Sequence, residues 1–394
     1  MSPLSLICRW PSPLRKLAAI LLLLLTVAPR PYCAWQLPVK SIPGSIAFGF
    51  DLGQSYGTSV ARFENGTTIT LVKIPGTVEY VTLMESLVAQ PITPNLLSYA
   101  GIVGRFLDMC RSILRSLGPA HAKEIRVLGE MLSALKTASG AILQTEVQAV
   151  AVTAPWVAAW DHQFPRSSVV NKALVRAGLE PFTWFSDGPI YLGETSAALA
   201  SEERWLCLKN WCTGHWMEVY GEEETTGGPL FFVSGCYFYG HQGNNLALID
   251  PRYGLDQKSL AESPAQFWSD LKSHIMSLVK EHGERVLGCE AQLPLTMLVT
   301  GEAADTPEFL DIVHGVVRET QQLCSREPKV AGCKANKTER EVDLVILDDG
   351  TYGPAKGAAF WLWTRMSSTY CAEYYAEHGI VEQSSMKKEV HKEL

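Results

Sequence analysis

A turn-like segment near the N-terminus carries residues suited to phosphate and metal chemistry. The segment Asp51-Leu-Gly-Gln-Ser-Tyr-Gly57 has the composition of a turn between two short β-rich runs. A glycine in such a turn lets backbone N–H groups approach phosphate oxygens, because no Cβ stands in the way. An adjacent aspartate can hold a hydrated divalent ion that bridges the phosphates. Gly53, Gln54, Ser55 and Asp51 fit these two roles, although hairpins use the same composition without any ligand.

Two later segments are rich in small residues and have the pattern of short helices. Small side chains let two helices cross closely, which suits a hinge about which a cleft opens and shuts around a ligand. A tightly packed pair of helices has the same requirement without any hinge. The small residues concerned are Ala197, Ala198, Gly357, Ala358 and Ala359.

Short strands and helices alternate along the chain between these segments. The predicted strands cover residues 45–50, 58–63, 67–72, 147–153, two runs within 229–250, 295–300 and 343–347. The predicted helices cover residues 122–142, 167–177, 195–200, 264–283, a segment that starts at Pro307, and 355–366. The first three strands are expected to form a meander, and the whole order predicts an α/β fold.

The order and spacing of these motifs resemble the actin-like ATPase superfamily, and within it the nucleotide-binding domain of the seventy-kilodalton heat-shock chaperones. The likeness spans about residues 45–366. The segments that carry it are Asp51-Leu-Gly-Gln-Ser-Tyr56 (first phosphate turn), Val147 to Pro155 with Ala177-Gly-Leu179 after it (strand and helix end), Gly193-Glu-Thr-Ser-Ala-Ala-Leu-Ala200 (first connecting helix), Val299-Thr-Gly-Glu-Ala303 (adenosine turn) and Gly353-Pro-Ala-Lys-Gly-Ala-Ala359 (second connecting helix).

The resemblance implies an actin-like ATPase, ribonuclease H-like fold of two lobes with a central nucleotide cleft. It divides the chain into lobe I at 42–200, lobe II at 201–342, a return to lobe I at 343–370, and a charged C-terminal tail at 371–394. About 28 residues follow Met366, so we expect neither the β-rich substrate-binding domain nor the helical lid of those chaperones.

The resemblance also implies ATP or ADP with Mg²⁺ as the cofactor. Asp51 and Glu194 would be the catalytic residues, and Asp51 would hold Mg²⁺ through water. The implied cofactor-binding residues are Asp51, Gly53, Gln54, Ser55, Tyr56, Gly235, Gly301, Glu302 and Ala303.

Two departures from the family pattern concern charge. The strand available for the second phosphate turn, residues 231–240, contains Gly235 but no carboxylate. The lysine expected after the meander has no counterpart in residues 90–109, where Arg105 is the only basic residue. Metal and cationic groups neutralise the charge that develops in phosphoryl transfer. We therefore expect weak or vestigial nucleotide binding with very slow or no turnover, as in a pseudo-ATPase.

The first 34 residues have the layout of a secretory leader. Arg9, Arg15 and Lys16 precede an apolar stretch from Leu17 to Ala28. A helix of that stretch rises roughly 18 Å, against a hydrocarbon core of about 30 Å. We therefore expect a signal peptide rather than a membrane anchor. A retained signal anchor stays open, and membrane attachment is expected only in that case.

The last four residues, His391-Lys-Glu-Leu394, resemble retrieval signals that end in Asp-Glu-Leu, with Lys in the usual place of Asp. Together with the leader they predict the endoplasmic reticulum lumen, with secretion as the alternative. Other lumenal folding factors are the expected partners.

Cysteines and glycosylation sequons fit that compartment. Removal of the leader takes two of the ten cysteines and leaves eight, an even number where disulfides persist. The favoured disulfide pairs are Cys207 with Cys212 and Cys324 with Cys333. Asn65-Gly-Thr67 and Asn336-Lys-Thr338 are acceptor sequons, expected on exposed loops. Chance occurrence without modification stays open.

Composition excludes some functions. The net charge is −7, from 34 Lys+Arg against 41 Asp+Glu, and no basic run lies outside the termini, so we expect no nucleic-acid binding.

The favoured hypothesis is an interaction or folding-accessory module with a degenerate nucleotide site. One alternative is an active Mg²⁺-dependent ATPase that uses Asp187 or Asp250 as its second acid. Another is a small-molecule kinase of the same superfamily, with Asp161 or another carboxylate as base.

Overall fold

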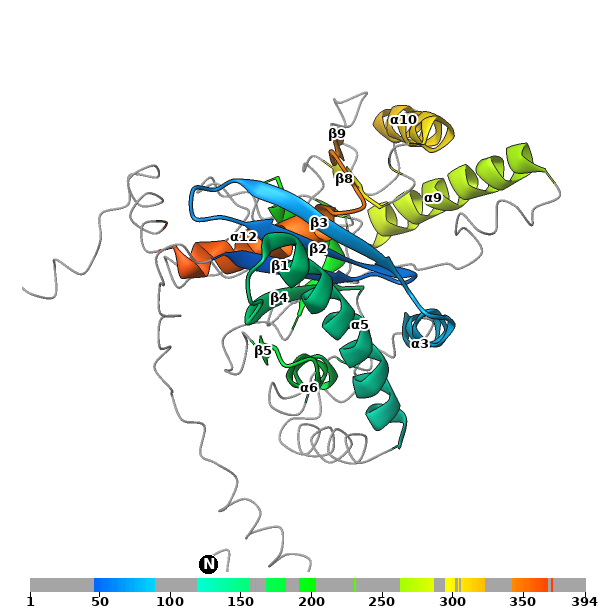
Figure 1. The fold of residues 1–394 in the computed structure, drawn as a ribbon. Coiled ribbons are helices and arrows are strands. Elements are labelled where there is room, and N and C mark those ends of the chain that lie inside the picture. The colour runs from blue at the N-terminus through cyan, green and yellow to red at the C-terminus, as the bar shows by residue number, and fades with distance from the viewer. Residues whose placement is uncertain are drawn as a thin grey trace, which may run out of the picture. The chain divides into compact units, whose positions relative to one another are not determined.

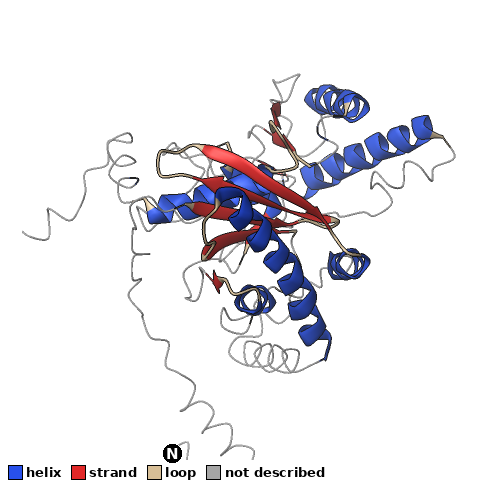
Figure 2. Cartoon of the chain, in the orientation of Figure 1, coloured by secondary structure: helices blue, strands red, loops and turns tan. Residues whose placement is uncertain are grey.

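The computed structural model describes residues 46–88, 119–155, 157, 160, 168–181, 191–202, 230–231, 263–286, 295–301, 304, 306–322, 342–367 and 370. Helices and strands alternate around a central sheet (Figures 1 and 2). The fold is mixed α/β, which confirms the α/β part of the predicted fold class. Within the described residues, no helix has the length and apolar character needed to cross a bilayer.

The larger sheet has six strands in the order β3-β2-β1-β4-β5, with β6 paired to β4. Its strands are β1 (Ala47–Leu52), β2 (Tyr56–Arg62), β3 (Thr68–Pro75), β4 (Ala149–Ala154), β5 (Glu180–Pro181) and β6 (Leu192–Gly193). The meander β1-β2-β3 is antiparallel, as predicted, because short turns join its strands. β4 runs parallel to β1, after a connection that includes a long helix.

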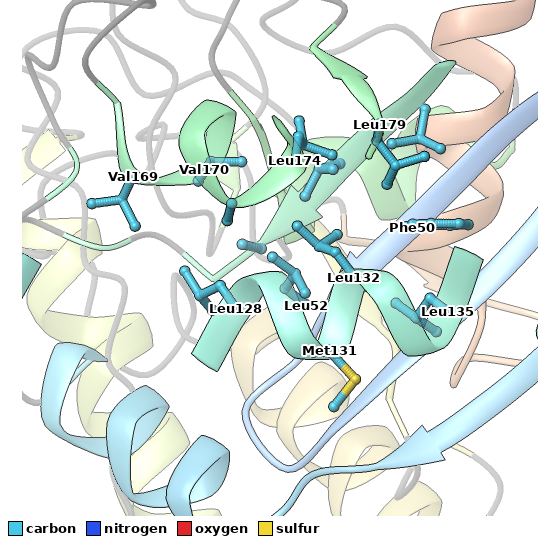
Figure 3. Packing of buried hydrophobic residues seen from close by; sticks show 14 of the residues in the cluster. Phe50, Leu52, Leu128, Met131, Leu132, Leu135, Val169, Val170, Leu174 and Leu179 are labelled. Carbon is cyan, nitrogen blue, oxygen red and sulfur yellow. The ribbon is translucent and has the colours of Figure 1, made fainter. Parts of the chain in front are cut away.

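One face of this sheet packs against α5 (Pro119–Leu143) and α6 (Val169–Arg176). Alternate residues of β1, namely Phe48, Phe50 and Leu52, point to this face and are buried. Figure 3 shows Phe50 and Leu52 meeting the apolar side chains of the two helices. The helical residues labelled there are Leu128, Met131, Leu132, Leu135, Val169, Val170 and Leu174. This cluster is the main hydrophobic core of the described chain.

The opposite face of the sheet packs against α12 (Gly353–Met366), which crosses α7 (Glu194–Ala200). Small residues make this contact close. A Cβ on Gly49 of β1 would lie 2.0 Å from the backbone oxygen of Ala355, and a Cβ on Gly357 would lie 1.6 Å from that of Ala197. The small-residue segments of the sequence therefore meet each other and the sheet through their backbones.

A second sheet has three parallel strands in the order β7-β8-β9. They are β7 (Leu230–Phe231), β8 (Leu295–Val299) and β9 (Val342–Ile346), and the helices α9 (Pro264–Val286) and α10 (Pro307–Gln321) contribute to its hydrophobic core. The predicted division at residue 342 assigns residues 343–347 to the segment that returns to lobe I. In the structure β9 pairs with β8, and α12 is the element that lies on the six-stranded sheet.

Three element predictions need correction. The turn between β1 and β2 is only residues 53–55, because both strands extend into the predicted turn. Helix α9 does not end at Gly283 but continues to Val286, since one glycine costs about 1 kcal/mol in a helix and need not end it. Helix α3 (Val78–Val88) is absent from the predicted elements. Its buried residues Tyr80, Leu83, Met84 and Leu87 follow the helical period, so the signal was present.

Candidate functional site

A row of polar side chains crosses the six-stranded sheet where β1 ends. Asp51 of β1 is opposite Thr58 of β2 and opposite Thr153 of β4. Residues opposite each other in a sheet point to the same side. Successive residues of a strand point to opposite faces of the sheet, so the Asp51 side chain points away from the face of Phe50 and Leu52. It points to the same face as Gly49, which packs against α12. The three side chains therefore line up on the α12 face.

Each member of this row is buried, with one oxygen atom that has no hydrogen-bond partner. Asp51 is 2% exposed, and Thr58 and Thr153 are 0% exposed. The unpartnered atoms are Oδ1 of Asp51 and the Oγ1 atoms of the two threonines. An unsatisfied buried polar group costs about 1–3 kcal/mol, so native proteins seldom keep one without a ligand, an ion or a water molecule. Three such atoms in one row mark this position as a candidate binding site.

The second carboxyl group comes from Glu194, the first residue of α7. Strand β6 leads directly into α7 and pairs with β4, with Leu192 opposite Thr153. This pairing brings Glu194 close to Asp51. Burial raises the pKa of Glu194 to about 7. Burial, and then the nearby charge of Glu194, raise the pKa of Asp51 well above its usual value.

Hydrogen bonds from Tyr80 of α3 and from Gly76, just before α3, hold the turn after β1. The Tyr80 hydroxyl donates a hydrogen bond to the carbonyl oxygen of Gly53 at 2.7 Å, and the N–H of Gly76 donates to the carbonyl oxygen of Ser55 at 2.8 Å. A Cβ on Gly53 would lie 3.0 Å from the Tyr56 carbonyl oxygen and 3.4 Å from Oδ2 of Asp51. Gln54 is partly buried and Ser55 is exposed. The turn is thus held beside the Asp51 carboxyl by contacts that the sequence alone did not reveal.

Tyrosine side chains border the two carboxyl groups. Burial, with the charges of Asp51 and Glu194, raises the pKa values of Tyr56 and Tyr80, so both phenols stay neutral at physiological pH. Tyr352, just before α12, is also close enough to Tyr56 to raise its pKa. The segment that leads into α12 therefore lies near the Asp51 row.

The predicted adenosine turn is described only in part. Gly301 has a φ of +93°, a conformation that glycine adopts without strain. Its N–H donates to the carbonyl oxygen of Gly350 at 3.0 Å, and the Thr300 hydroxyl donates to the same oxygen at 2.9 Å. The Gly301 turn therefore contacts the segment that carries Tyr352.

The site residues predicted from the sequence differ in where the structure places them, and Gly301 lies in the separate turn described above. The structure brings Asp51, Gly53, Tyr56 and Glu194 together, with Gln54 and Ser55 in the adjoining turn. Asn65 lies exposed in the β2–β3 turn, where its Oδ1 accepts a hydrogen bond from the Thr67 N–H at 3.0 Å. The predicted residues outside the described parts are Asp161, Asp187, Cys207, Cys212, Gly235, Asp250, Glu302, Ala303, Cys324, Cys333 and Asn336.

Thr58 and Thr153 are site residues that the sequence analysis missed. Threonine is common in strands, so neither residue stands out until pairing places it beside Asp51.

The donor set favours a hydrated cation over a fully protein-ligated one. Among the described residues, no group of three or more His, Cys, Asp and Glu side chains is placed to hold a metal ion. Two carboxyl groups and two hydroxyls can instead hold a divalent ion that keeps several water ligands, which is the usual mode of Mg²⁺. Glu194, with a pKa of about 7, is also suited to accept or donate a proton near neutral pH.

Comparisons with known proteins provide little information about the function of this site. No protein-family model matches the sequence, and no curated protein matches it. Among solved structures, the crystal structure of ethanolamine utilization protein EutJ from Carboxydothermus hydrogenoformans is similar over 82% of this chain and 92% of that chain, with 13% identity and a TM-score of 0.38. A likeness at this level is too weak to assign a function, so the assignment depends on the residues of this chain.

Proposed function

We propose that this protein binds an adenine nucleotide together with Mg²⁺ at the Asp51 row, on a two-lobed fold of the actin-like ATPase type. The observation that carries the proposal is the buried Asp51 carboxyl, with an unpartnered oxygen, between the unpartnered hydroxyls of Thr58 and Thr153. The glycine-containing turn beside it supplies backbone that a phosphate group can approach.

A cation is the natural complement of this site. Asp51 and Glu194 raise the cost of ionising each other, and burial adds to that cost. A divalent ion between them reverses this effect, because it stabilises both carboxylates at once. A nucleotide polyphosphate is itself an anion and would be repelled by bare carboxylates, so it needs the same ion as a bridge. Mg²⁺ and nucleotide are therefore expected to bind together.

Weak binding and little or no turnover are part of the proposal. The segment 231–240 offers no second carboxylate, and phosphoryl transfer depends on metal and cationic groups placed around the phosphates. The protein would then act as an interaction module with folding factors as partners. Its conformation would depend on whether nucleotide is bound. An active ATPase is the second candidate, favoured by Glu194, whose pKa of about 7 suits a general base for water.

Thermal unfolding of the purified protein tests the proposal. ATP with Mg²⁺ at a hundred times its dissociation constant should stabilise the folded state by about 2.7 kcal/mol. Asp51→Asn and Glu194→Gln should lose this stabilisation, and the matched control Glu85→Gln, on the exposed side of α3, should keep it. Equal stabilisation of the wild-type and Asp51→Asn proteins would reject the site.

Phosphate release separates the two candidates. If the protein is an interaction module, Mg²⁺-dependent release of phosphate from ATP should not exceed the level of the Glu194→Gln variant. Turnover that is present in the wild-type protein and absent from Glu194→Gln and Asp51→Asn would favour the ATPase.

The cellular address is a separate proposal that rests on the leader and on residues 391–394. In secretory cells the full chain should stay in the endoplasmic reticulum, and a chain without residues 391–394 should appear in the medium. Asn65 lies in an exposed turn, so Asn65→Gln should remove the mass of one glycan. Unglycosylated protein in the cytosol would contradict the address.

A further inference from the structure

We propose that Lys73 on β3 is a phosphate-binding residue of the Asp51 site and supplies the positive charge that the sequence motifs lack. The inference rests on the proposed nucleotide function and extends it. The juxtaposition that carries it is a continuous row of four polar side chains, one on each of four neighbouring strands: Lys73, Thr58, Asp51 and Thr153.

The register of the meander places Lys73 in this row. Lys73 pairs with Thr58, which pairs with Asp51. Paired residues point to the same side of a sheet, so the Lys73 side chain emerges on the α12 face with the other three. Its neighbours Val72 and Ile74 point the other way and pack against the main core.

A β-bulge creates this register. Val60 pairs with Thr70, but Ser59 pairs with Val72, so Leu71 is an extra residue in β3. If β3 kept Leu71 but had no bulge, Leu71 would pair with Ser59, apolar Val72 would lie opposite Thr58, and Lys73 would point toward the main core. Bulges re-aim side chains and are common beside functional sites. The bulge therefore exchanges a valine for a lysine at the end of the polar row.

The Lys73 ammonium group lies beside the candidate site. Its Nζ is 4.4 Å from the centre of the Tyr56 ring, and Tyr56 is one of the two tyrosines whose pKa is raised by both Asp51 and Glu194. Lys73 and Asp51 are separated by two strand spacings, about 10 Å between backbones. This separation suits an anion held between the ammonium group and a cation on Asp51.

Other basic side chains on this face have different positions. The Arg62 guanidinium group lies over the rings of Phe360 and Trp363, and that of Arg365 over Trp361. Lys356 donates to the Asp348 carbonyl oxygen at 3.2 Å and lies 3.7 Å from an Asp349 carboxylate oxygen. Among the basic residues described on β2, β3 and α12, Lys73 is therefore the one placed at the Asp51 row.

The test compares ligands that differ in phosphate number. Binding of ATP, ADP and adenosine, each with Mg²⁺, is measured by isothermal titration for the wild-type protein, Lys73→Gln and Lys73→Arg. The matched control is Lys123→Gln, on α5 at the opposite face of the sheet, where Lys123 lies 3.9 Å from Glu79. Circular dichroism checks that each variant is folded, which is expected because Lys73 is exposed.

Lys73→Gln should weaken ATP binding about tenfold or more, the usual range for a charge-assisted hydrogen bond. Its ATP affinity should fall less steeply with added salt, and its adenosine affinity should match the wild type, because adenosine carries no phosphate. Lys73→Arg should retain most of the ATP affinity, and Lys123→Gln all of it.

Two results would overturn the proposal, and they have different consequences for the proposed function. If the wild-type protein binds ATP and Lys73→Gln binds it equally well, Lys73 has no role and the proposed function stands. If the wild-type protein binds neither ATP nor ADP, the proposed function fails and the role of Lys73 fails with it.

Discussion

The carboxyl groups of Asp51 and Glu194 share one buried site, although they come from a strand and a helix that are far apart in the sequence. Strand pairing brings them together: β4 lies between β1 and β6, and β6 leads directly into α7. Burial and the proximity of two like charges both oppose ionisation of the pair. The stability of the protein and its affinity for cations should therefore depend on pH.

The stability of the metal-free protein should fall as the pH rises from about 4.5 to about 7. The folded state holds the Glu194 proton to about pH 7, whereas the unfolded chain releases it near 4.5. In that window the unfolded chain binds fewer protons, so the free energy of unfolding decreases with pH. Glu194→Gln should therefore exceed the wild type in stability by roughly 1–3 kcal/mol at pH 8 and match it at pH 4.

Urea unfolding in the presence of a chelator at several pH values measures this difference. Glu85→Gln, an exposed carboxyl on α3, should follow the wild-type curve throughout. Parallel curves for Glu194→Gln and the wild type would contradict the buried carboxyl pair.

Added Mg²⁺ should raise the thermal stability at pH 8 and have little effect at pH 5. A divalent ion binds ionised carboxylates. At the lower pH burial keeps Glu194 protonated, and burial also opposes ionisation of Asp51. Binding should also release protons into a weakly buffered solution. Asp51→Asn should abolish both effects, and a Mg²⁺ response that does not depend on pH would place the ion elsewhere.

Tyr80→Phe should destabilise the protein by about 1–2 kcal/mol, because it leaves the Gly53 carbonyl oxygen without the hydrogen bond from the Tyr80 hydroxyl. The same change should weaken nucleotide binding, since the hydrogen bond holds the turn beside Asp51. Chemical unfolding and nucleotide titration measure the two effects. Tyr352→Phe serves as control for the loss of stability, and equal stability of the two variants would count against the anchoring role of Tyr80.

Gly357→Ala should be strongly destabilising, by about 3 kcal/mol or more, because the new Cβ would lie 1.6 Å from the Ala197 backbone oxygen. The helices α7 and α12 would have to separate, which would also move Glu194. Gly315→Ala in α10 is the matched control. Its Cβ would meet only the end of the flexible Lys272 side chain at 3.2 Å, so alanine should be neutral or slightly stabilising in that helix. Comparable stability of both variants would refute the close crossing.

The sequence by itself determined the local elements and their type. Alternating and helical patterns located the meander, α5, α9, α10 and α12, because each such pattern is a local consequence of burying one side of an element. The resemblance of its motifs to a known family also predicted Asp51 and Glu194 as site residues, and the structure places the two carboxyl groups close together. Helix α3 had the same signal and shows that a readable pattern can still be missed.

Only the tertiary structure decided which side chains meet. Thr58, Thr153 and Lys73 are ordinary strand residues in the sequence, and they become neighbours of Asp51 through the register of four strands. That register depends on one extra residue, Leu71, and on packing between segments far apart in the chain. A shift by one residue turns every side chain of a strand to the opposite face, so the composition of the site is a property of the whole sheet rather than of any motif.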